Sequence, residues 1–161
     1  MIYEPNAIFN KVTDIKPEFL KENNIKGIIL DVDNTLITLD GKKLAGIDDW
    51  VEKIKNSGFK IYIASNTLKY KRVKDIADEL KIDFTFWSLK PLKRGLIQAK
   101  WYLKLPSNEI AEIGDQFFTD VIGAKRMKMF SILTKPLSPE KTSFGRLKRK
   151  IEKRVLSKIK L

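Results

Sequence analysis

The chain has 161 residues, no cysteine, no histidine and a net charge of +12. The two absent residue types exclude disulfides, thiolate catalysis, zinc–thiolate sites and the usual general base, so carboxylates, Lys, Ser/Thr and a hard metal ion have to supply any chemistry. The charge is uneven, because residues 141–161 hold nine Lys/Arg and one acidic residue, a net +8.

Short apolar runs alternate with amphipathic stretches along the chain, as strands and helices do in α/β proteins. The runs predict strands at residues 27–30, 59–64, 84–87, 109–113 and 130–133. The stretches predict helices near residues 16–21, 47–54, 73–80, 92–103 and 119–127. The rest of residues 1–25 reads as an irregular lead-in that offers Tyr3, Ile8, Phe9 and Val12 for packing. The alternation predicts an α/β domain with one parallel sheet and helices on both faces.

Two aspartates follow the first predicted strand, 27–30, with one residue between them. If the chain stays extended there, the side chains of Asp31 and Asp33 point the same way. Carboxylates so close together need a cation, a proton or hydrogen-bond donors beside them. A calcium loop is excluded, because Leu36 and Lys42 stand where such a loop requires Gly and Glu. The pair therefore indicates a metal site or acid/base chemistry.

Polar residues also follow three later strands. Ser65 and Asn66 follow the second predicted strand, Lys90 the third and Asp115 the fourth. A parallel sheet brings all these strand ends to one edge, where α/β proteins bind ligands. For Ser65 and Asn66 the alternative is a helix cap, and the neighbouring Lys93 and Arg94 compete with Lys90.

Such a group suits a phosphate ester and Mg²⁺, which prefers oxygen ligands. Asp31 and Asp115 can supply carboxylates to the metal, and Asp33 its main-chain carbonyl. Without thiol or imidazole, the covalent nucleophile is expected to be a carboxylate, which gives an aspartyl-phosphate. Lys90 would stabilise the charge of the transferred group. Asp33 would protonate the leaving oxygen and then activate water.

The motifs resemble those of the haloacid dehalogenase-like (HAD) phosphatases in order along the chain. The matching segments are Asp31-Val32-Asp33-Asn34-Thr35, Ser65, Lys90, and Gly114-Asp115 with Asp120. The resemblance implies a three-layer Rossmannoid fold around a central parallel sheet. It also implies that Asp31 is the nucleophile and that Asp33 is the general acid/base.

The same resemblance assigns supporting roles. Ser65 and Lys90 would hold the phosphate, and Asp115 would bind Mg²⁺. Asp120 would support the metal ligands or orient Lys90, although a helix-capping role is the alternative. Thr35 and Asn66 complete the predicted phosphate-binding set as supports rather than reactants.

A finer resemblance is to the YqeG-like members of HAD subfamily IIIA. It rests on the motifs above, on Gly114-Asp115-Gln116-Phe117-Phe118-Thr119-Asp120, and on the tail segments Phe144-Gly145-Arg146 and Lys153-Arg154-Val155-Leu156. Related proteins include phosphatidylglycerophosphate phosphatases, so a phospholipid headgroup is one expected substrate. Nucleotides, nucleic-acid ends and small phosphorylated metabolites are alternatives. A further alternative is a binding protein without catalysis, recruited through its basic tail.

The spacing of the motifs leaves no room for a large cap domain. Between Asp33 and Ser65 lie 31 residues, and between Ser65 and Lys90 lie 24, each taken up by a predicted helix and strand. We therefore expect an open site in a phosphatase domain of residues 1–140, followed by a basic amphipathic helix at 141–161.

The tail carries an apolar stripe at helical spacing among its basic residues: Phe144, Leu147, Ile151, Val155 and Ile159. Such a helix can dock on its own domain or lie on an anionic membrane surface, and nucleic acid is a weaker alternative. No apolar run is long enough to span a membrane, and the amino terminus lacks the apolar core of a secretion signal. We expect a cytoplasmic protein, and the membrane alternative for the tail would attach it peripherally to the inner face of the membrane. The sequence does not decide the oligomeric state.

Overall fold

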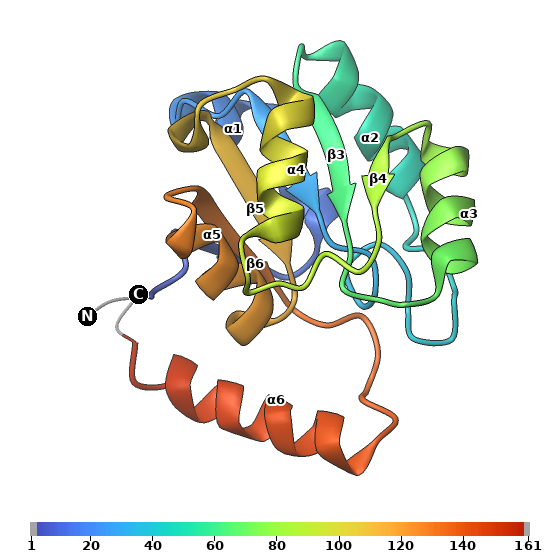
Figure 1. Ribbon diagram of the computed structural model, residues 1–161, viewed down its shortest axis with the longest axis vertical. Helices are drawn as coiled ribbons and strands as arrows, with labels where there is room; N and C mark the ends of the chain where they lie inside the picture. Colours follow the sequence, from blue (N-terminus) through green and yellow to red (C-terminus); the bar gives the residue numbers. More distant parts are fainter. Residues whose placement is uncertain (1–2, 160–161) are drawn as a thin grey trace.

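The computed structural model describes residues 3–159 and consists of a six-stranded sheet between two helical layers (Figure 1). The strands lie in the order β1-β6-β5-β2-β3-β4, and every neighbouring pair is parallel. Their bounds are β1 Ala7–Phe9, β2 Gly27–Leu30, β3 Lys60–Ala64, β4 Phe84–Thr85, β5 Ile110–Gly114 and β6 Phe130–Thr134. The predicted parallel sheet with helices on both faces is confirmed.

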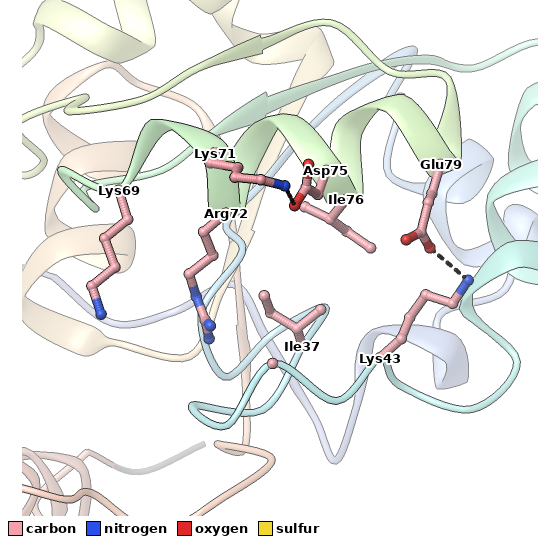
Figure 2. A pocket seen from close by; sticks show the side chains of 9 residues that line it. Ile37, Lys43, Lys69, Lys71, Arg72, Asp75, Ile76 and Glu79 are labelled. Carbon is pink, nitrogen blue, oxygen red and sulfur yellow. Dashed lines mark hydrogen bonds and ion pairs between the residues drawn. The ribbon is translucent and has the colours of Figure 1, made fainter.

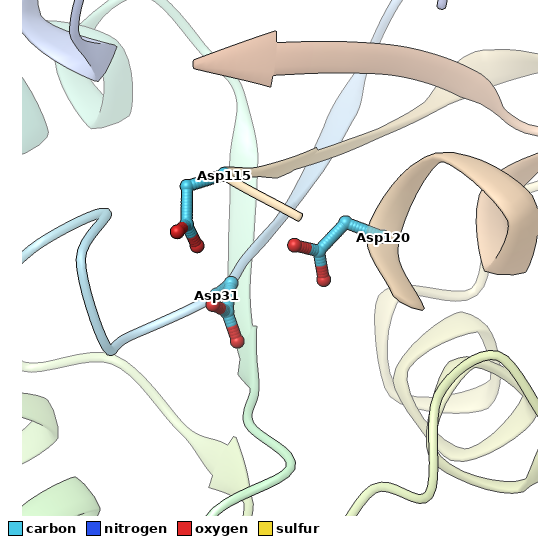
Figure 3. A group of neighbouring side chains, drawn as sticks. All are labelled: Asp31, Asp115 and Asp120. Atoms are coloured by element: carbon cyan, nitrogen blue, oxygen red, sulfur yellow. The ribbon is translucent and has the colours of Figure 1, made fainter. Parts of the chain in front are cut away.

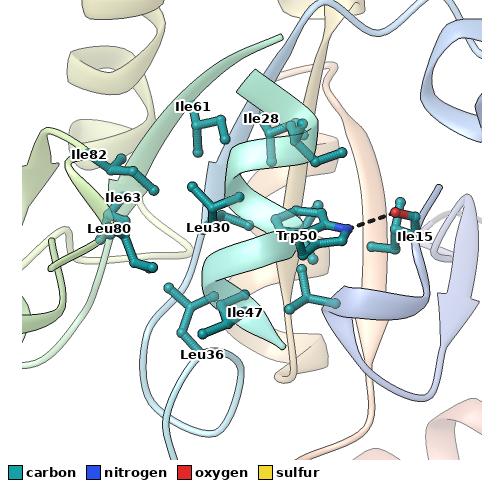
Figure 4. Close-up of a cluster of buried hydrophobic side chains, with 14 of the residues drawn as sticks. Ile15, Ile28, Leu30, Leu36, Ile47, Trp50, Ile61, Ile63, Leu80 and Ile82 are labelled. Atoms are coloured by element: carbon teal, nitrogen blue, oxygen red, sulfur yellow. Dashed lines mark hydrogen bonds between the residues drawn. The ribbon is translucent and has the colours of Figure 1, made fainter. Parts of the chain in front are cut away.

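Alternation along the central strands separates two cores, one on each face of the sheet. Ile28 and Leu30 of β2 pack with the larger cluster, which Figure 4 shows around Trp50, whereas Ile29 packs with the smaller one. Helices α1 (Pro17–Glu22), α2 (Ile47–Asn56) and α3 (Tyr70–Leu80) supply the first cluster. Helices α4 (Arg94–Leu103) and α5 (Ile122–Arg126) supply the second. Burial on both faces explains why the central strands are continuous apolar runs.

The lead-in prediction was wrong for residues 7–9, because they form β1. This strand adds to the edge of the sheet by pairing with β6, from Ala7 with Ile132 to Phe9 with Thr134. Val12 is buried as expected, whereas Tyr3 and Ile8 are exposed. A three-residue edge strand carries little hydrophobic pattern, so its pairing depends on backbone hydrogen bonds that composition does not reveal.

Two other elements differ from prediction near the carboxyl edge of the sheet. The third predicted strand ends at Thr85, because the chain turns away at Trp87, where φ is +48°. The helix expected near 119–127 begins earlier, with a π-helical turn at Phe117–Val121 that continues into α5. Both departures bring motif residues to the sheet edge, as described below.

No cap domain is inserted among residues 34–89, where the chain forms only a loop, α2, β3, α3 and β4. After β6 the chain crosses to helix α6 (Ser143–Leu156), which lies beyond the carboxyl ends of the strands (Figure 1). Residues 160 and 161 of the predicted tail helix lie outside the described residues. Among the helices within 3–159, none combines the length and apolar character needed to cross a membrane.

Candidate active site

The register of the sheet brings two predicted site residues to adjacent strand ends. Leu30 of β2 pairs with Ile113 of β5. Asp31 comes one residue after Leu30 and Asp115 two residues after Ile113, so both lie at the carboxyl ends of neighbouring strands. Both aspartates are buried. On the other side, Leu30 pairs with Ile63 of β3, which places Ser65 at the same edge.

Lys90 lies at the centre of a buried carboxylate cluster. Its Nζ is 3.2 Å from Asp31 Oδ1 and 2.9 Å from Glu112 Oε1, and it donates a hydrogen bond to each. Its distance to Asp120 Oδ1 is 2.7 Å, although that contact is not aligned as a hydrogen bond. Since Lys90 itself is only 4% exposed, solvent screens these interactions little.

The turn after β4 positions Lys90. The Ser88 amide donates to the Ser65 carbonyl at 2.8 Å, which ties this turn to the end of β3. The Asn66 side chain then brackets the Lys90 backbone: its amide donates to the Lys90 carbonyl and its oxygen accepts from the Lys90 amide, both at 2.7 Å. Asn66 therefore acts as a support of Lys90 in this geometry, and its predicted phosphate contact stays a prediction.

Asp120 joins Asp31 and Asp115 in a compact acidic group (Figure 3). Each of the three offers a carboxylate oxygen, and these oxygens lie within 4.8 Å of one another. The π-helical turn turns Asp120 inward, and its Oδ2 accepts from the Gln116 amide at 3.0 Å. A side chain at Gly114 would collide with the Asp120 carboxylate, so glycine is required there.

The charges of this cluster are not balanced by protein groups alone. Burial raises the pKa of Asp31 well above its usual value; Lys90 lowers it, while Asp120, Asp115 and Glu112 raise it further. Burial likewise raises the pKa of Asp115 to about 7, against the lowering effect of Arg149. Burial alone would lower the pKa of Lys90, but Asp120, Asp31 and Glu112 together raise it. A site in which carboxylates hold protons so strongly has room for additional positive charge.

Asp33 lies outside this acidic group. Its Oδ1 accepts from Arg72 Nε of α3 at 2.6 Å, and its side chain is 28% exposed. Arg72 also donates to the Thr38 carbonyl at 2.8 Å. The Asp33 carboxylate is therefore held by Arg72 and is not one of the three carboxylates of the acidic group, and a metal contact through the Asp33 main-chain carbonyl stays a prediction.

A hollow of about 520 Å³ lies between α3 and the loop that follows Asp33, and Arg72 is one of its lining residues. Figure 2 shows the side chains that line it. Four of its charged lining residues form ion pairs with one another, Lys71 with Asp75 at 2.7 Å and Lys43 with Glu79 at 3.0 Å, whereas Arg72 pairs with Asp33 outside the lining. Because these two ion pairs are exposed, they are screened by solvent and differ from the buried cluster around Lys90.

Thr35 and Ser65 are both buried at the edge of the sheet. The Thr35 hydroxyl donates to Asp115 Oδ1 at 3.2 Å, which makes Thr35 a support of Asp115. The Ser65 hydroxyl accepts from the Thr67 amide at 3.3 Å, a local turn contact that leaves its own proton available.

Three charged residues of the cluster were missed in the sequence. Glu112 is fully buried in β5, where a charged residue inside an apolar run signals a buried partner. Glu152 is buried in α6 and is the one acidic residue of the basic tail. Arg149 reaches Asp115 from α6. Arg149 gave no signal, because it is one of nine basic residues in that segment.

Comparison with known proteins agrees with this geometry. Residues 2–138 match the family described as mitochondrial PGP phosphatase. The chain is also 35% identical over 157 residues to the probable phosphatase YqeG of Bacillus subtilis, which covers 97% of this chain and 91% of that protein.

Two solved structures share the fold. A protein of Listeria monocytogenes serotype 4b aligns with a TM-score of 0.58 and 24% identity, over 73% of this chain and 85% of that one. A predicted HAD-like family hydrolase of Porphyromonas gingivalis aligns with a TM-score of 0.55 and 15% identity, over 76% of this chain and 97% of that one. The chain is a HAD-type phosphatase and belongs to the mitochondrial PGP phosphatase family.

Proposed function

We propose that this phosphatase hydrolyses phosphomonoesters with Mg²⁺, through an aspartyl-phosphate formed on Asp31. The observation that carries the proposal is the position of Lys90 Nζ, 3.2 Å from Asp31 Oδ1 inside a buried carboxylate cluster. An ammonium group beside a buried carboxylate provides a fixed positive charge where the phosphoryl group would arrive.

The residues present fit a divalent cation. Asp31, Asp115 and Asp120 offer hard oxygen ligands within 4.8 Å of one another, and burial together with the neighbouring carboxylates raises the pKa of both Asp31 and Asp115. Asp31, Asp115 and the Asp33 carbonyl would hold Mg²⁺, with Asp120 beside them. When bound, the ion neutralises charge on the transferred phosphoryl group.

The first step transfers the phosphoryl group to the protein. An Asp31 carboxylate oxygen attacks phosphorus, and the bond from phosphorus to the ester oxygen breaks. The leaving oxygen takes a proton from the Asp33 carboxyl group. Because Arg72 holds Asp33 Oδ1, the free Oδ2 is the oxygen available for this transfer.

The second step regenerates the site. Asp33, now a carboxylate, takes a proton from a water molecule, and the resulting hydroxide attacks phosphorus. The bond between phosphorus and Asp31 breaks, which releases inorganic phosphate and returns both carboxyl groups to their starting states. Lys90 and Ser65 hold the phosphate oxygens through both steps.

For the substrate we propose a phosphomonoester on an anionic phospholipid headgroup, such as phosphatidylglycerophosphate. The matched family's description and the surface of α6 support this choice. Phe144 is 78% exposed and Leu147 is 56% exposed, and Ile151 is also exposed, with basic residues around them. Apolar side chains among Lys/Arg suit a helix that lies on anionic lipid, where each basic residue contributes about 1 kcal/mol.

Phosphate release from an aryl phosphate tests the chemistry. Asp31→Asn keeps the shape of the side chain but removes the nucleophile, so release should fall to background while the fold persists. Activity that survives in this variant would contradict the nucleophile assignment. A panel of phosphatidylglycerophosphate, nucleotides and sugar phosphates then tests the substrate class, and turnover confined to the soluble esters would contradict the lipid proposal.

Binding to vesicles that contain phosphatidylglycerol tests the tail. Phe144→Ser with Leu147→Ser should weaken binding about tenfold, because two apolar contacts with the membrane interface are lost. The matched control is Ile97→Ser with Trp101→Ser, which removes exposed apolar side chains from α4 and should leave binding unchanged. Equal losses in both pairs would contradict a specific role of α6.

A further inference from the structure

Helix α6 docks on the domain mainly through charged side chains. Its buried residue is Glu152, while three members of the predicted apolar stripe, Phe144, Leu147 and Ile151, are exposed. Glu152 accepts from the Phe118 amide at 3.3 Å. Apolar contact is confined to the end of the helix, where Val155 and Leu156 pack near Phe117 and Leu133, as does Ile159 beyond it. The side of α6 that faces the sheet is therefore built around polar contacts to the active-site edge.

Arg149 makes the closest of these contacts. Its guanidinium donates to the Asp115 main-chain carbonyl at 2.6 Å through Nη1 and pairs with Asp115 Oδ2 through Nη2. The same group donates to Glu140 at 2.8 Å and to Glu152 at 3.1 Å. The carboxylates of Glu140 and Glu152 thus hold the guanidinium in the position from which it contacts Asp115.

This contact fixes the orientation of Asp115. A planar guanidinium that binds both the main-chain oxygen and the carboxylate of one residue restricts rotation of the bonds between them. The other carboxylate oxygen, Oδ1, accepts from Thr35 at 3.2 Å. Each carboxylate oxygen has a second lone pair, so Asp115 can still bind a metal ion.

We propose that Arg149 is a positioning residue that holds Asp115 in the orientation needed for the divalent metal, which makes the C-terminal helix part of the metal centre. The inference rests on the proposed metal-dependent function. The partners that orient a metal ligand set affinity, and their loss typically weakens metal binding about 10–100-fold.

Charge alone would act in the opposite direction. Removing a cation beside Asp115 would strengthen binding of a second cation, because like charges repel. A positioning role instead makes binding weaker when the guanidinium is lost. The sign of the change in metal affinity therefore separates the two roles.

The experiment measures Mn²⁺ binding to the full-length protein directly, by the electron paramagnetic resonance signal of free Mn²⁺, with Mg²⁺ as competitor. The first variant is Arg149→Gln, which removes both the charge and the planar guanidinium. The second is Arg149→Lys, which keeps the charge but cannot bind the Asp115 main-chain oxygen and Oδ2 together. The matched control is Lys150→Gln, which removes the same charge from the next, exposed residue. Circular dichroism and thermal unfolding check that each variant folds.

The proposal expects a dissociation constant about tenfold higher in both Arg149 variants and an unchanged one in Lys150→Gln. Unchanged or tighter binding in Arg149→Gln would overturn it, as would wild-type binding in Arg149→Lys. If one Arg149 variant fails to fold, the other decides by the same criterion. Absence of Mn²⁺ binding in the wild-type protein is a different result, because it would refute the metal-dependent function itself.

Discussion

The buried Glu112 leads to a prediction about stability that can be worked out from the structure. Its side chain has no access to solvent, and burial raises its pKa from 4.5 to about 8, against the lowering effect of Lys90. The folded protein therefore keeps a proton on Glu112 at neutral pH, whereas the unfolded chain releases it. Since the unfolded state binds fewer protons between these two pKa values, stability falls as pH rises through that window.

Glu112→Gln replaces the protonated carboxyl group with a neutral amide of nearly the same shape. The amide oxygen can still accept from Lys90, so phosphate release should change only a few-fold. Relative to the variant, the wild-type protein should lose about 2.5 kcal/mol of unfolding free energy between about pH 5 and about pH 7.

Urea unfolding of both proteins at the two pH values, with a chelator present, measures this difference. The chelator matters because a bound cation would favour the charged form of nearby carboxylates. If the free-energy difference between wild type and Glu112→Gln were the same at both pH values, Glu112 would be ionised with an ordinary pKa, and the reasoning about this cluster would be refuted.

Three further substitutions separate the roles of individual contacts. Asn66→Ala removes both 2.7 Å hydrogen bonds to the Lys90 backbone, so it should lower the free energy of unfolding in urea by about 1–3 kcal/mol and should lower kcat. Asn66→Asp should restore neither the stability nor kcat fully, because a carboxylate cannot donate to the Lys90 carbonyl. Gly114→Ala forces a methyl group against the Asp120 carboxylate and should cost about 1–3 kcal/mol in the same assay together with weaker Mn²⁺ binding; unchanged values would contradict the packing described. Trp50→Phe loses the buried 2.8 Å hydrogen bond to the Ile15 carbonyl (Figure 4), so Tm should fall by a few degrees while kcat stays constant, and an altered kcat would show that the core and the site are coupled.

The fold was largely predictable because burial on both faces of a parallel sheet leaves a strong pattern. The central strands are runs such as Gly27–Leu30 and Ile110–Gly114, and every residue in both is buried. The edge strand β1 left no such pattern, since its middle residue, Ile8, is exposed. The π-helical turn at Phe117–Val121 was not predictable either, because one added residue in a helical turn does not change the apolar spacing enough to be seen.

The site was predictable where motif residues directly follow strands. Asp31 and Asp115 are fixed by the sheet register, and Lys90 meets Asp31 as expected. Partner choice among charged residues was not predictable, because it depends on which side chains tertiary packing brings together. Arg72 pairs with Asp33 across 39 positions, and Arg149 reaches Asp115 across 34.

The late position of Arg149 in the chain also bears on the order in which the protein matures during synthesis. The ribosome releases β1 early, but Asn6 and Ser131, which bond beside the edge of the sheet, are 125 positions apart. The edge strand β1 can therefore pair with β6 only after most of the chain has been synthesised, and Arg149 is synthesised later still. A nascent chain that has completed its core would still lack the guanidinium that holds Asp115, so the contact between Arg149 and Asp115 is among the last features of the molecule to form.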